Sequence, residues 1–248
     1  MTEQEKLMYQ VLHNLSSTNQ PIVFLGALVT KAILSNNGFE DVLRATRDID
    51  ANWIGDKPSM QHLVDVVNDS LKNLPSNYEA IAYRNHDEGV SAGLQVIDKD
   101  TGFKVFDIDI DISSVAGVQE YHYGDAIFKG VLPSEILADK LCVLSSRIIF
   151  RRTKDLIDIY ALSHCVDVSS KDIFDICNSK GNEIKDFDEF YNRKGDLEHS
   201  YEKLKGVLGK PNFNEVYVHL DNFVKPFVNK DTTQYWNHKT KEWTSRVQ

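Results

Sequence analysis

This 248-residue chain is poor in cysteine, in long apolar runs and in positive charge. Its cysteines, Cys142, Cys165 and Cys177, have no Cys-x-x-Cys spacing, so we expect reduced thiols and no zinc site. No apolar run is long enough to span a bilayer, and residues 1–6 are too polar for a signal peptide, which predicts a cytoplasmic protein without a membrane partner. The formal charge of −9 argues against a surface that coats nucleic acid broadly.

Signatures of several other protein classes are also missing. The eight histidines show no His-x-x-x-His spacing, and there is no Gly-x-Ser-x-Gly motif, internal repeat or low-complexity segment. A local basic groove stays open, because Arg147, Arg151, Arg152 and Lys154 lie close together in the sequence.

What the chain does have is two clusters of aspartate on predicted strands. The first holds Asp48 and Asp50, and the second holds Asp107, Asp109 and Asp111. Side chains two residues apart on a strand share a face, so each cluster stacks like charges that repel one another. A divalent cation would relieve that repulsion, and oxygen ligands favour Mg²⁺ or Mn²⁺. The alternative is a solvent-facing strand with alternating acids, and the occurrence of two clusters favours the metal.

Three residues close to the first cluster are candidates for contacts with phosphate. Gly26, followed by Ala27, stands at a strand-to-helix junction, where backbone amides and the helix dipole attract anions, although an ordinary tight turn is the alternative. Arg44 and Arg47 flank the first aspartate cluster. They would pair with the carboxylates, with a triphosphate, or in surface salt bridges.

A third group lies on two predicted helices in the second half of the chain. Asp155 and Asp158 are three residues apart and share a helix face, and Lys140 is on the preceding helix. For the two aspartates we favour a structural ion-pair network over direct catalysis. For Lys140 we favour a phosphate contact over a place in that network.

The order of expected elements divides the chain into a mixed-sheet α/β half and a helical half. We place the boundary so that residues 1–130 form the core with an N-terminal helix, and residues 131–248 form a helical domain that ends in an arm from residue 229. Expected strands are 21–25, 48–53, 78–84, 90–97 and 103–113. Expected helices are 3–17, 29–35, 58–71, 134–147, 152–165, 170–179, 186–192, 196–207 and 213–228.

Four motifs together resemble the nucleotidyltransferase toxins of the AbiEii/AbiGii group, within the DNA polymerase β-like nucleotidyltransferase superfamily. The resemblance covers about residues 22–162 and, more loosely, continues to residue 228. The motif on the two predicted helices, the last of the four given below, is the most distinctive, because the general superfamily lacks it. The motifs are Leu25-Gly26-Ala27-Leu28, Arg44 to Asp50, Asp109-Ile110-Asp111-Ile112-Ser113, and Ala138-Asp139-Lys140-Leu141 with Lys154 to Tyr160.

The resemblance implies an α+β fold, with a nucleotidyltransferase core before the helical domain, and a role for each matching residue. Asp48, Asp50 and a third carboxylate would hold Mg²⁺ or Mn²⁺; the Asp-Ile-Ser pattern favours Asp111, with Asp109 as the alternative. Lys140 would assist catalysis by neutralising the triphosphate. The implied nucleotide-binding residues are Gly26, Ala27, Arg44, Thr46, Arg47, Lys140, Asp155 and Asp158. Two positions depart from the family pattern: Ala27 replaces a second glycine or a serine, and Asp139 replaces a glutamate.

The implied activity is transfer of a nucleotidyl group from a nucleoside triphosphate to a hydroxyl, with release of pyrophosphate. The acceptor would be RNA, with the tRNA 3′ end as the first candidate, and the protein would be the toxin of a toxin–antitoxin or phage-defence pair. A cognate antitoxin need not contact it. Two alternatives stay open: transfer to a small molecule or a protein hydroxyl, and a non-enzymatic nucleotide-binding regulatory module.

Overall fold

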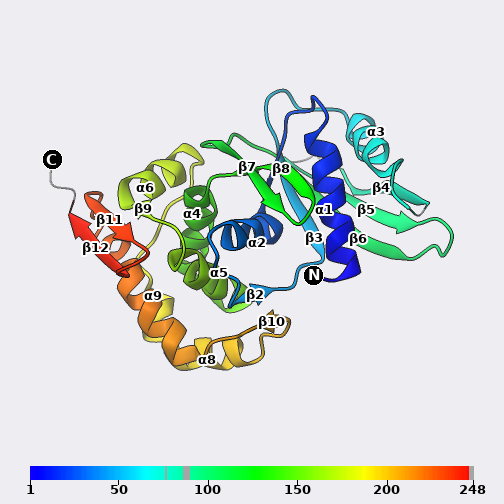
Figure 1. The fold of residues 1–248 in the computed structure, drawn as a ribbon. Helices are drawn as coiled ribbons and strands as arrows, with labels where there is room; N and C mark the ends of the chain where they lie inside the picture. Colours follow the sequence, from blue (N-terminus) through cyan, green and yellow to red (C-terminus); the bar gives the residue numbers. More distant parts are fainter. Residues whose placement is uncertain (76, 86–89, 246–248) are drawn as a thin grey trace. The chain divides into compact units, whose positions relative to one another are not determined.

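The computed structural model describes residues 1–75, 77–85 and 90–245, and the chain forms two compact units. Unit 1 comprises residues 1–32 and 46–131, and unit 2 comprises residues 33–45 and 132–248 (Figure 1). The chain leaves unit 1 within helix α2 (Gly26–Asn36), returns after Ala45, and leaves again after Val131.

Unit 1 is built on a seven-stranded mixed sheet with the strand order β4-β5-β6-β3-β1-β8-β7. The pairs β3·β6 and β1·β8 are parallel and the others are antiparallel. This confirms the α+β class with a mixed sheet. The strands are β1 (Ile22–Leu25), β3 (Asp48–Trp53), β4 (Tyr78–Arg84), β5 (Ser91–Asp98), β6 (Lys104–Ile112), β7 (Val118–Tyr123) and β8 (Ala126–Val131).

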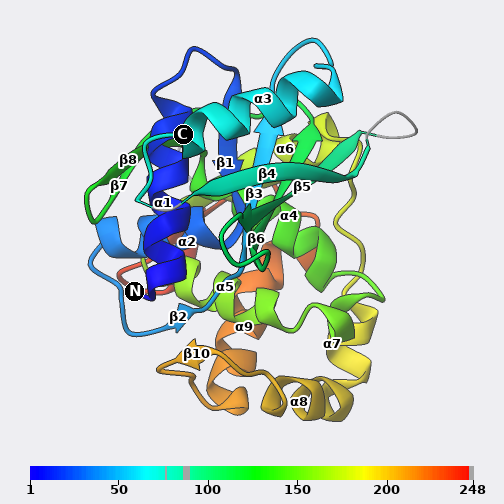
Figure 2. The same cartoon turned by 90° about the vertical axis from the view of Figure 1, so that its right-hand side faces the viewer.

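Two amphipathic helices pack on this sheet. Helix α1 (Glu3–Ser16) begins with a capping box between Thr2 and Glu5, and helix α3 (Met60–Leu71) begins at the N-cap Ser59. Helix α1 contacts β8, helix α3 contacts β4, and the two helices contact each other (Figure 2). Their apolar faces, which include Met8 and Leu63, are fully buried, so they supply core on one side of the sheet.

Unit 2 is mainly helical. Helix α4 packs against α5 and α6, and α5 packs against α9. The helices are α4 (Pro133–Leu144), the 3-10 helix η1 (Ile149–Arg151), α5 (Lys154–Ser163), α6 (Ser170–Ser179), α7 (Asp188–Asn192), α8 (Lys194–Glu202) and α9 (Phe213–Val228). No helix in the described part of the chain combines the length and the apolar character needed to cross a membrane.

Two small sheets complete unit 2. Strand β2 (Leu43–Arg44) pairs with β10 (Val207–Leu208), and β11 (Gln234–Asn237) lies between β12 (Glu242–Ser245) and β9 (Val168–Ser169). The arm expected from residue 229 is therefore largely a β-hairpin. Its Trp236 is fully buried, and the indole Nε1 donates to the Ser163 carbonyl at 2.7 Å.

The structure corrects several expected element boundaries. The sequence prediction had no strands between residues 114 and 131, where β7 and β8 form a hairpin. Helix α2 begins at Gly26 and not near residue 29, because Gly26 enters it with φ of +74°. The helix expected over 134–147 ends at Leu144, and the one expected over 196–207 covers residues 194–202.

Candidate functional site

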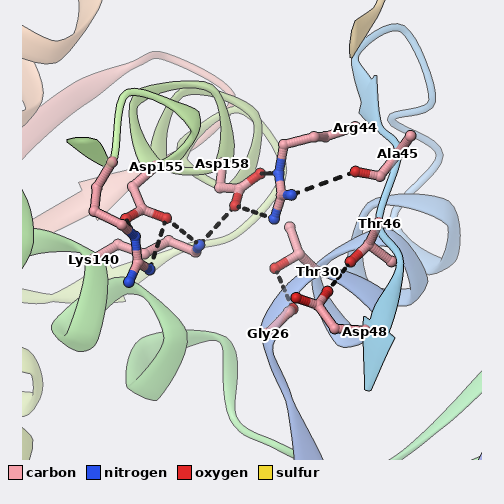
Figure 3. Close-up of polar contacts among 10 residues, drawn as sticks. Gly26, Thr30, Arg44, Ala45, Thr46, Asp48, Lys140, Asp155 and Asp158 are labelled. Carbon is pink, nitrogen blue, oxygen red and sulfur yellow. Dashed lines mark hydrogen bonds and ion pairs between the residues drawn. The ribbon is translucent and has the colours of Figure 1, made fainter. Parts of the chain in front are cut away.

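The first aspartate cluster lies on β3, in the middle of the unit 1 sheet. Asp48 and Asp50 are half-buried, whereas Ile49 between them is fully buried, which confirms the alternation predicted from the sequence. The buried Thr46 hydroxyl donates to Asp48 Oδ1 (Figure 3). The strand therefore turns its two carboxylates away from the apolar side.

The second cluster lies on β6, beside β3, and the register fixes which carboxylates are neighbours. The parallel pairing sets Asp50 opposite Asp109, and Asn52 opposite Asp111. In-register side chains on adjacent strands point to the same face, so Asp109 adjoins Asp50. Asp111, which the sequence pattern favoured as third carboxylate, is one two-residue step further along and is exposed.

Gly26 lies against the Asp50 carboxylate. Strand β1 pairs Leu25 with Asp50, and a Cβ added to Gly26 would stand 1.9 Å from Asp50 Oδ2. Glycine is therefore required both for the left-handed φ of +74° and for this close approach. The Thr30 hydroxyl donates to the Gly26 carbonyl at 2.9 Å and braces the first turn of α2 (Figure 3). The positive end of the α2 dipole thus begins beside the aspartates.

Asp109 is held by two side chains from the edge strand β4. The Tyr83 hydroxyl donates to Asp109 Oδ1 at 2.9 Å, and Arg84 Nη2 donates to the same oxygen at 2.7 Å. Partial burial, together with the hydrogen bond to the Asp109 carboxylate, raises the pKa of Tyr83. Neither residue stands out in the sequence; the one local signal is Gly93, a glycine inside a strand pattern on the neighbouring β5.

The carboxylates suit a hard divalent cation by type but are not gathered around one point. Among the described residues, no group of three or more His, Cys, Asp or Glu side chains is placed to hold a metal ion. Protein donors hold several of the acids: Thr46 bonds Asp48, and Lys104 Nζ lies 2.9 Å from Asp107 Oδ2. A bound cation would take the place of such donors as the source of positive charge.

A second group of predicted residues forms a buried ion-pair network in unit 2. Lys140 Nζ lies 3.0 Å from Asp155 Oδ1 and 2.6 Å from Asp158 Oδ2. Arg44 contacts both Asp158 oxygens at 3.2 Å (Figure 3). Arg152 Nε lies 2.9 Å from Asp155 Oδ2. Strand β2 positions Arg44, helix α4 positions Lys140, and helix α5 positions the two aspartates, while Arg152 directly follows η1.

Opposing effects of burial and pairing set the electrostatics of this network. Burial alone would raise the pKa of Asp158, but the charges of Lys140 and Arg44 lower it to about 2. Burial alone would lower the pKa of Lys140, but Asp158 and Asp155 raise it. Three cations, the third being Arg152, surround two carboxylates, so the network carries one net positive charge. Lys140 is engaged in the network that the sequence predicted for the two aspartates.

The predicted site residues thus fall in both units. Arg47 is exposed, and Ala27 is buried in the first turn of α2. Unit 1 holds Gly26, Ala27, Thr46, Arg47, Asp48, Asp50, Asp109 and Asp111, and unit 2 holds Arg44, Lys140, Asp155 and Asp158.

Comparisons with known proteins give a likeness in structure only. No protein-family model matches the chain, and no curated protein sequence is significantly similar to it. JHP933 from Helicobacter pylori superimposes with a TM-score of 0.59 at 16% identity, over 93% of this chain and 94% of that one. The chain has the fold of that protein. A second structure from H. pylori, provisionally described as a nucleotidyltransferase, gives the same score and identity over 93% of this chain and 97% of its own.

A weaker likeness is to MenT4, a nucleotidyltransferase toxin from Mycobacterium tuberculosis. It has a TM-score of 0.49 at 17% identity, over 77% of this chain and 66% of that one. That score is too low to support an inference. The comparisons therefore establish the fold, while the AbiEii/AbiGii group stays a resemblance carried by the motifs.

Proposed function

We propose that this chain is a nucleotidyltransferase that uses Mg²⁺ or Mn²⁺ to transfer a nucleotidyl group from a nucleoside triphosphate to a hydroxyl. The observation that carries the proposal is the arrangement around Asp50. Gly26 at the start of α2 lies against its carboxylate, and Asp109 stands in register with it on the adjacent strand. A glycine-started helix beside paired acids combines an anion-attracting end with ligands for a hard cation.

The carboxylates and the glycine turn of unit 1 each have a defined part in this proposal. Asp48 and Asp50 supply charged oxygens to the cation, which when bound would screen the phosphates and favour ionisation of the acceptor hydroxyl. The amides that follow Gly26 bind phosphate oxygens, without help from the Ala27 side chain. We assign the third carboxylate, which accepts the acceptor proton, to Asp109, because it adjoins Asp50 whereas Asp111 adjoins Asn52.

We propose that the unit 2 residues help to bind the nucleotide, which is the role that the family resemblance implies for them. Support comes from the net positive charge of the network of Arg44, Lys140, Asp155, Asp158 and Arg152, and from the burial of its central residues Lys140, Asp155 and Asp158. Lys140 would act mainly by holding the two aspartates. Of these, Asp158 in turn orients Arg44, whose planar guanidinium suits phosphate oxygens.

The acceptor and the biological setting rest on the motif resemblance alone. We propose RNA, with the tRNA 3′ end as first candidate, and a toxin or phage-defence role whose antitoxin need not bind the enzyme. A small-molecule or protein hydroxyl is the second candidate acceptor. A non-enzymatic regulatory module is the third possibility, and the carboxylate row on β3 and β6 speaks against it because two acidic strands side by side are costly without a cation.

The test is transfer of label from each of four radiolabelled nucleoside triphosphates to total RNA, with pyrophosphate release measured in parallel. Asp50→Asn and Asp109→Asn should lower the rate by roughly 10²–10⁴-fold, because the amide keeps the shape and loses the charge. The control is Asp125→Asn, at an exposed position between β7 and β8, which should keep full activity.

Two results would contradict the proposal at different levels. If Asp111→Asn abolishes transfer while Asp109→Asn does not, the third carboxylate is Asp111. If no nucleotide yields pyrophosphate with either cation and any RNA, the chain is not an RNA nucleotidyltransferase. Labelled small molecules or proteins in the same reactions would then identify the second candidate acceptor.

A further inference from the structure

The edge strand β4 contains an irregularity that redirects two side chains. Its pairing with β5 sets Ala82 opposite Leu94 and then Arg84 opposite Gly93, so Tyr83 is an extra residue, a β-bulge. In a regular strand, consecutive side chains point to opposite faces. Here Tyr83 and Arg84 both reach the same oxygen of Asp109, at 2.9 Å and 2.7 Å. Bulges are enriched beside active sites, where they re-aim a side chain.

Gly93 makes room for the ring of Tyr83. A Cβ on Gly93 would stand 2.6 Å from the Tyr83 Cζ atom, so the ring lies on the bare backbone of β5. Gly93 is in turn opposite Asp109, and Asp109 is opposite Asp50. The bulge therefore extends the row of proposed catalytic acids to an aromatic ring at the sheet edge.

The two side chains remain open to solvent. Tyr83 is 48% exposed, and the side chain of Arg84 is 44% exposed. The Arg84 guanidinium carbon stands 5.7 Å from the centre of the Tyr83 ring. An exposed ring with a guanidinium beside it is the combination that proteins use to stack the bases of single-stranded nucleic acid and to attract its phosphates.

We infer that Tyr83 and Arg84 form the acceptor subsite, in which the ring of Tyr83 stacks a base at the end of a single-stranded RNA and Arg84 attracts its backbone. The inference rests on the proposed nucleotidyl transfer for its place in the reaction. Local binding of this kind agrees with the overall charge of −9, which leaves little of the surface attractive to RNA. It also places the acceptor next to Asp109, the proposed proton acceptor.

The test measures RNA binding without catalysis. Fluorescence anisotropy of a fluorescein-labelled 12-nucleotide single-stranded RNA is followed with the full-length protein in EDTA. Tyr83→Leu should weaken binding about tenfold, because it removes one stacked base. Tyr83→Phe keeps the ring and should bind within about twofold of the unaltered protein. Gly93→Ala leaves Tyr83 in place but displaces its ring, so it should resemble Tyr83→Leu.

The matched control is Phe103→Leu, which removes an aromatic ring that is 75% exposed and precedes β6. It should leave RNA affinity unchanged. Affinity for a fluorescent ATP analogue, measured with Mg²⁺, should be unchanged in all four variants. Circular dichroism melting confirms that each variant is folded.

The outcomes separate this inference from the proposed function. If the protein transfers nucleotides but Tyr83→Leu binds RNA as tightly as the unaltered protein, the subsite is wrong and the transferase stands. If RNA affinity falls in Tyr83→Leu and Gly93→Ala while no nucleotide is transferred, the RNA-binding subsite is supported and the proposed transferase activity is refuted. If the unaltered protein does not bind the RNA, or only a protein acceptor responds to Tyr83→Leu, the inference of an RNA subsite is overturned.

Discussion

Replacing Gly26 by alanine should separate backbone strain from a collision at the proposed catalytic centre. The new Cβ would stand 1.9 Å from Asp50 Oδ2 and 2.8 Å from Asp50 Cγ, whereas ordinary contact begins at 3.4 Å. The carboxylate must therefore move by about 1.5 Å, the difference between 3.4 Å and 1.9 Å. A matched control lies just after α2, at Gly38: its φ is +70°, and nothing lies within 4 Å of its Cβ position.

The two substitutions share one cost and differ in the other. Alanine in a left-handed conformation costs about 1–2 kcal/mol, so Gly38→Ala should lose that much stability. Gly26→Ala should lose the same amount plus about 1 kcal/mol for forcing Asp50 out of its rotamer. Transfer should fall roughly 100-fold in Gly26→Ala, because a displacement of about 1 Å disrupts a preorganised site, and should be unchanged in Gly38→Ala.

Thermal unfolding and pyrophosphate release measure these two effects, and the Mg²⁺-induced rise in melting temperature adds a third. That rise should shrink in Gly26→Ala, because a displaced Asp50 binds the cation less well, and a weaker ligand stabilises less by mass action. Equal loss of stability in both variants, with a normal Mg²⁺ response and normal activity in Gly26→Ala, would refute the placement of the Asp50 carboxylate against Gly26.

Three further predictions concern unit 2. Burial lowers the pKa of His219 to about 3, so below pH 6.5 the unfolded chain binds more protons than the folded protein, and the free energy of unfolding decreases as the pH is lowered. At pH 5 the loss is about 2 kcal/mol, and His219→Gln should flatten the pH dependence of urea-unfolding stability across pH 4–6.5. Lys140→Met should cost about 3 kcal/mol at neutral pH, and the cost should shrink as the pH is lowered, because the substitution raises the pKa of Asp158 and protonation then removes its unpaired buried charge; a loss under about 1 kcal/mol at neutral pH would contradict a buried ammonium. Hydrogen peroxide should join Cys142 and Cys177, whose Sγ atoms lie 3.4 Å apart, forming two waters and lowering the intact mass by about 2 Da; an equal loss in Cys177→Ser would contradict this pairing.

Local patterns in the sequence predicted the faces of the strands correctly but not how the strands align. Alternation placed Ile49, Ile108 and Ile110 in the core, and all three are fully buried. Whether Asp109 or Asp111 adjoins Asp50 depends on the register between β3 and β6. The 50 residues from 54 to 103 separate these two strands, and no local signal specifies such a pairing.

Element boundaries failed where a local signal was overlooked or was overridden by tertiary structure. The hairpin of β7 and β8 has a turn at Gly124-Asp125 between two alternating segments, so its sequence signal was present. The helix expected over 152–165 loses its first residues to the turn after η1, and α5 begins only at Lys154. The β-bulge at Tyr83 left no trace in the sequence except Gly93 on the neighbouring strand.

Three glycines of unit 1 show when a close approach of backbone and side chain points to function. Gly26, Gly93 and Gly130 each leave space that another side chain occupies: Asp50, the ring of Tyr83 and the ring of Tyr121 respectively. Tyr121 is 1% exposed and its hydroxyl donates to a backbone carbonyl, so Gly130 serves core packing. The occupants at Gly26 and Gly93 are partly exposed and polar. A polar group is costly to bury unless it is hydrogen-bonded, so a glycine that seats a polar group at the solvent boundary leaves that group accessible to a ligand. We therefore propose that the row from Gly26 to Gly93, and not any single aspartate, forms the ligand-binding face of the sheet.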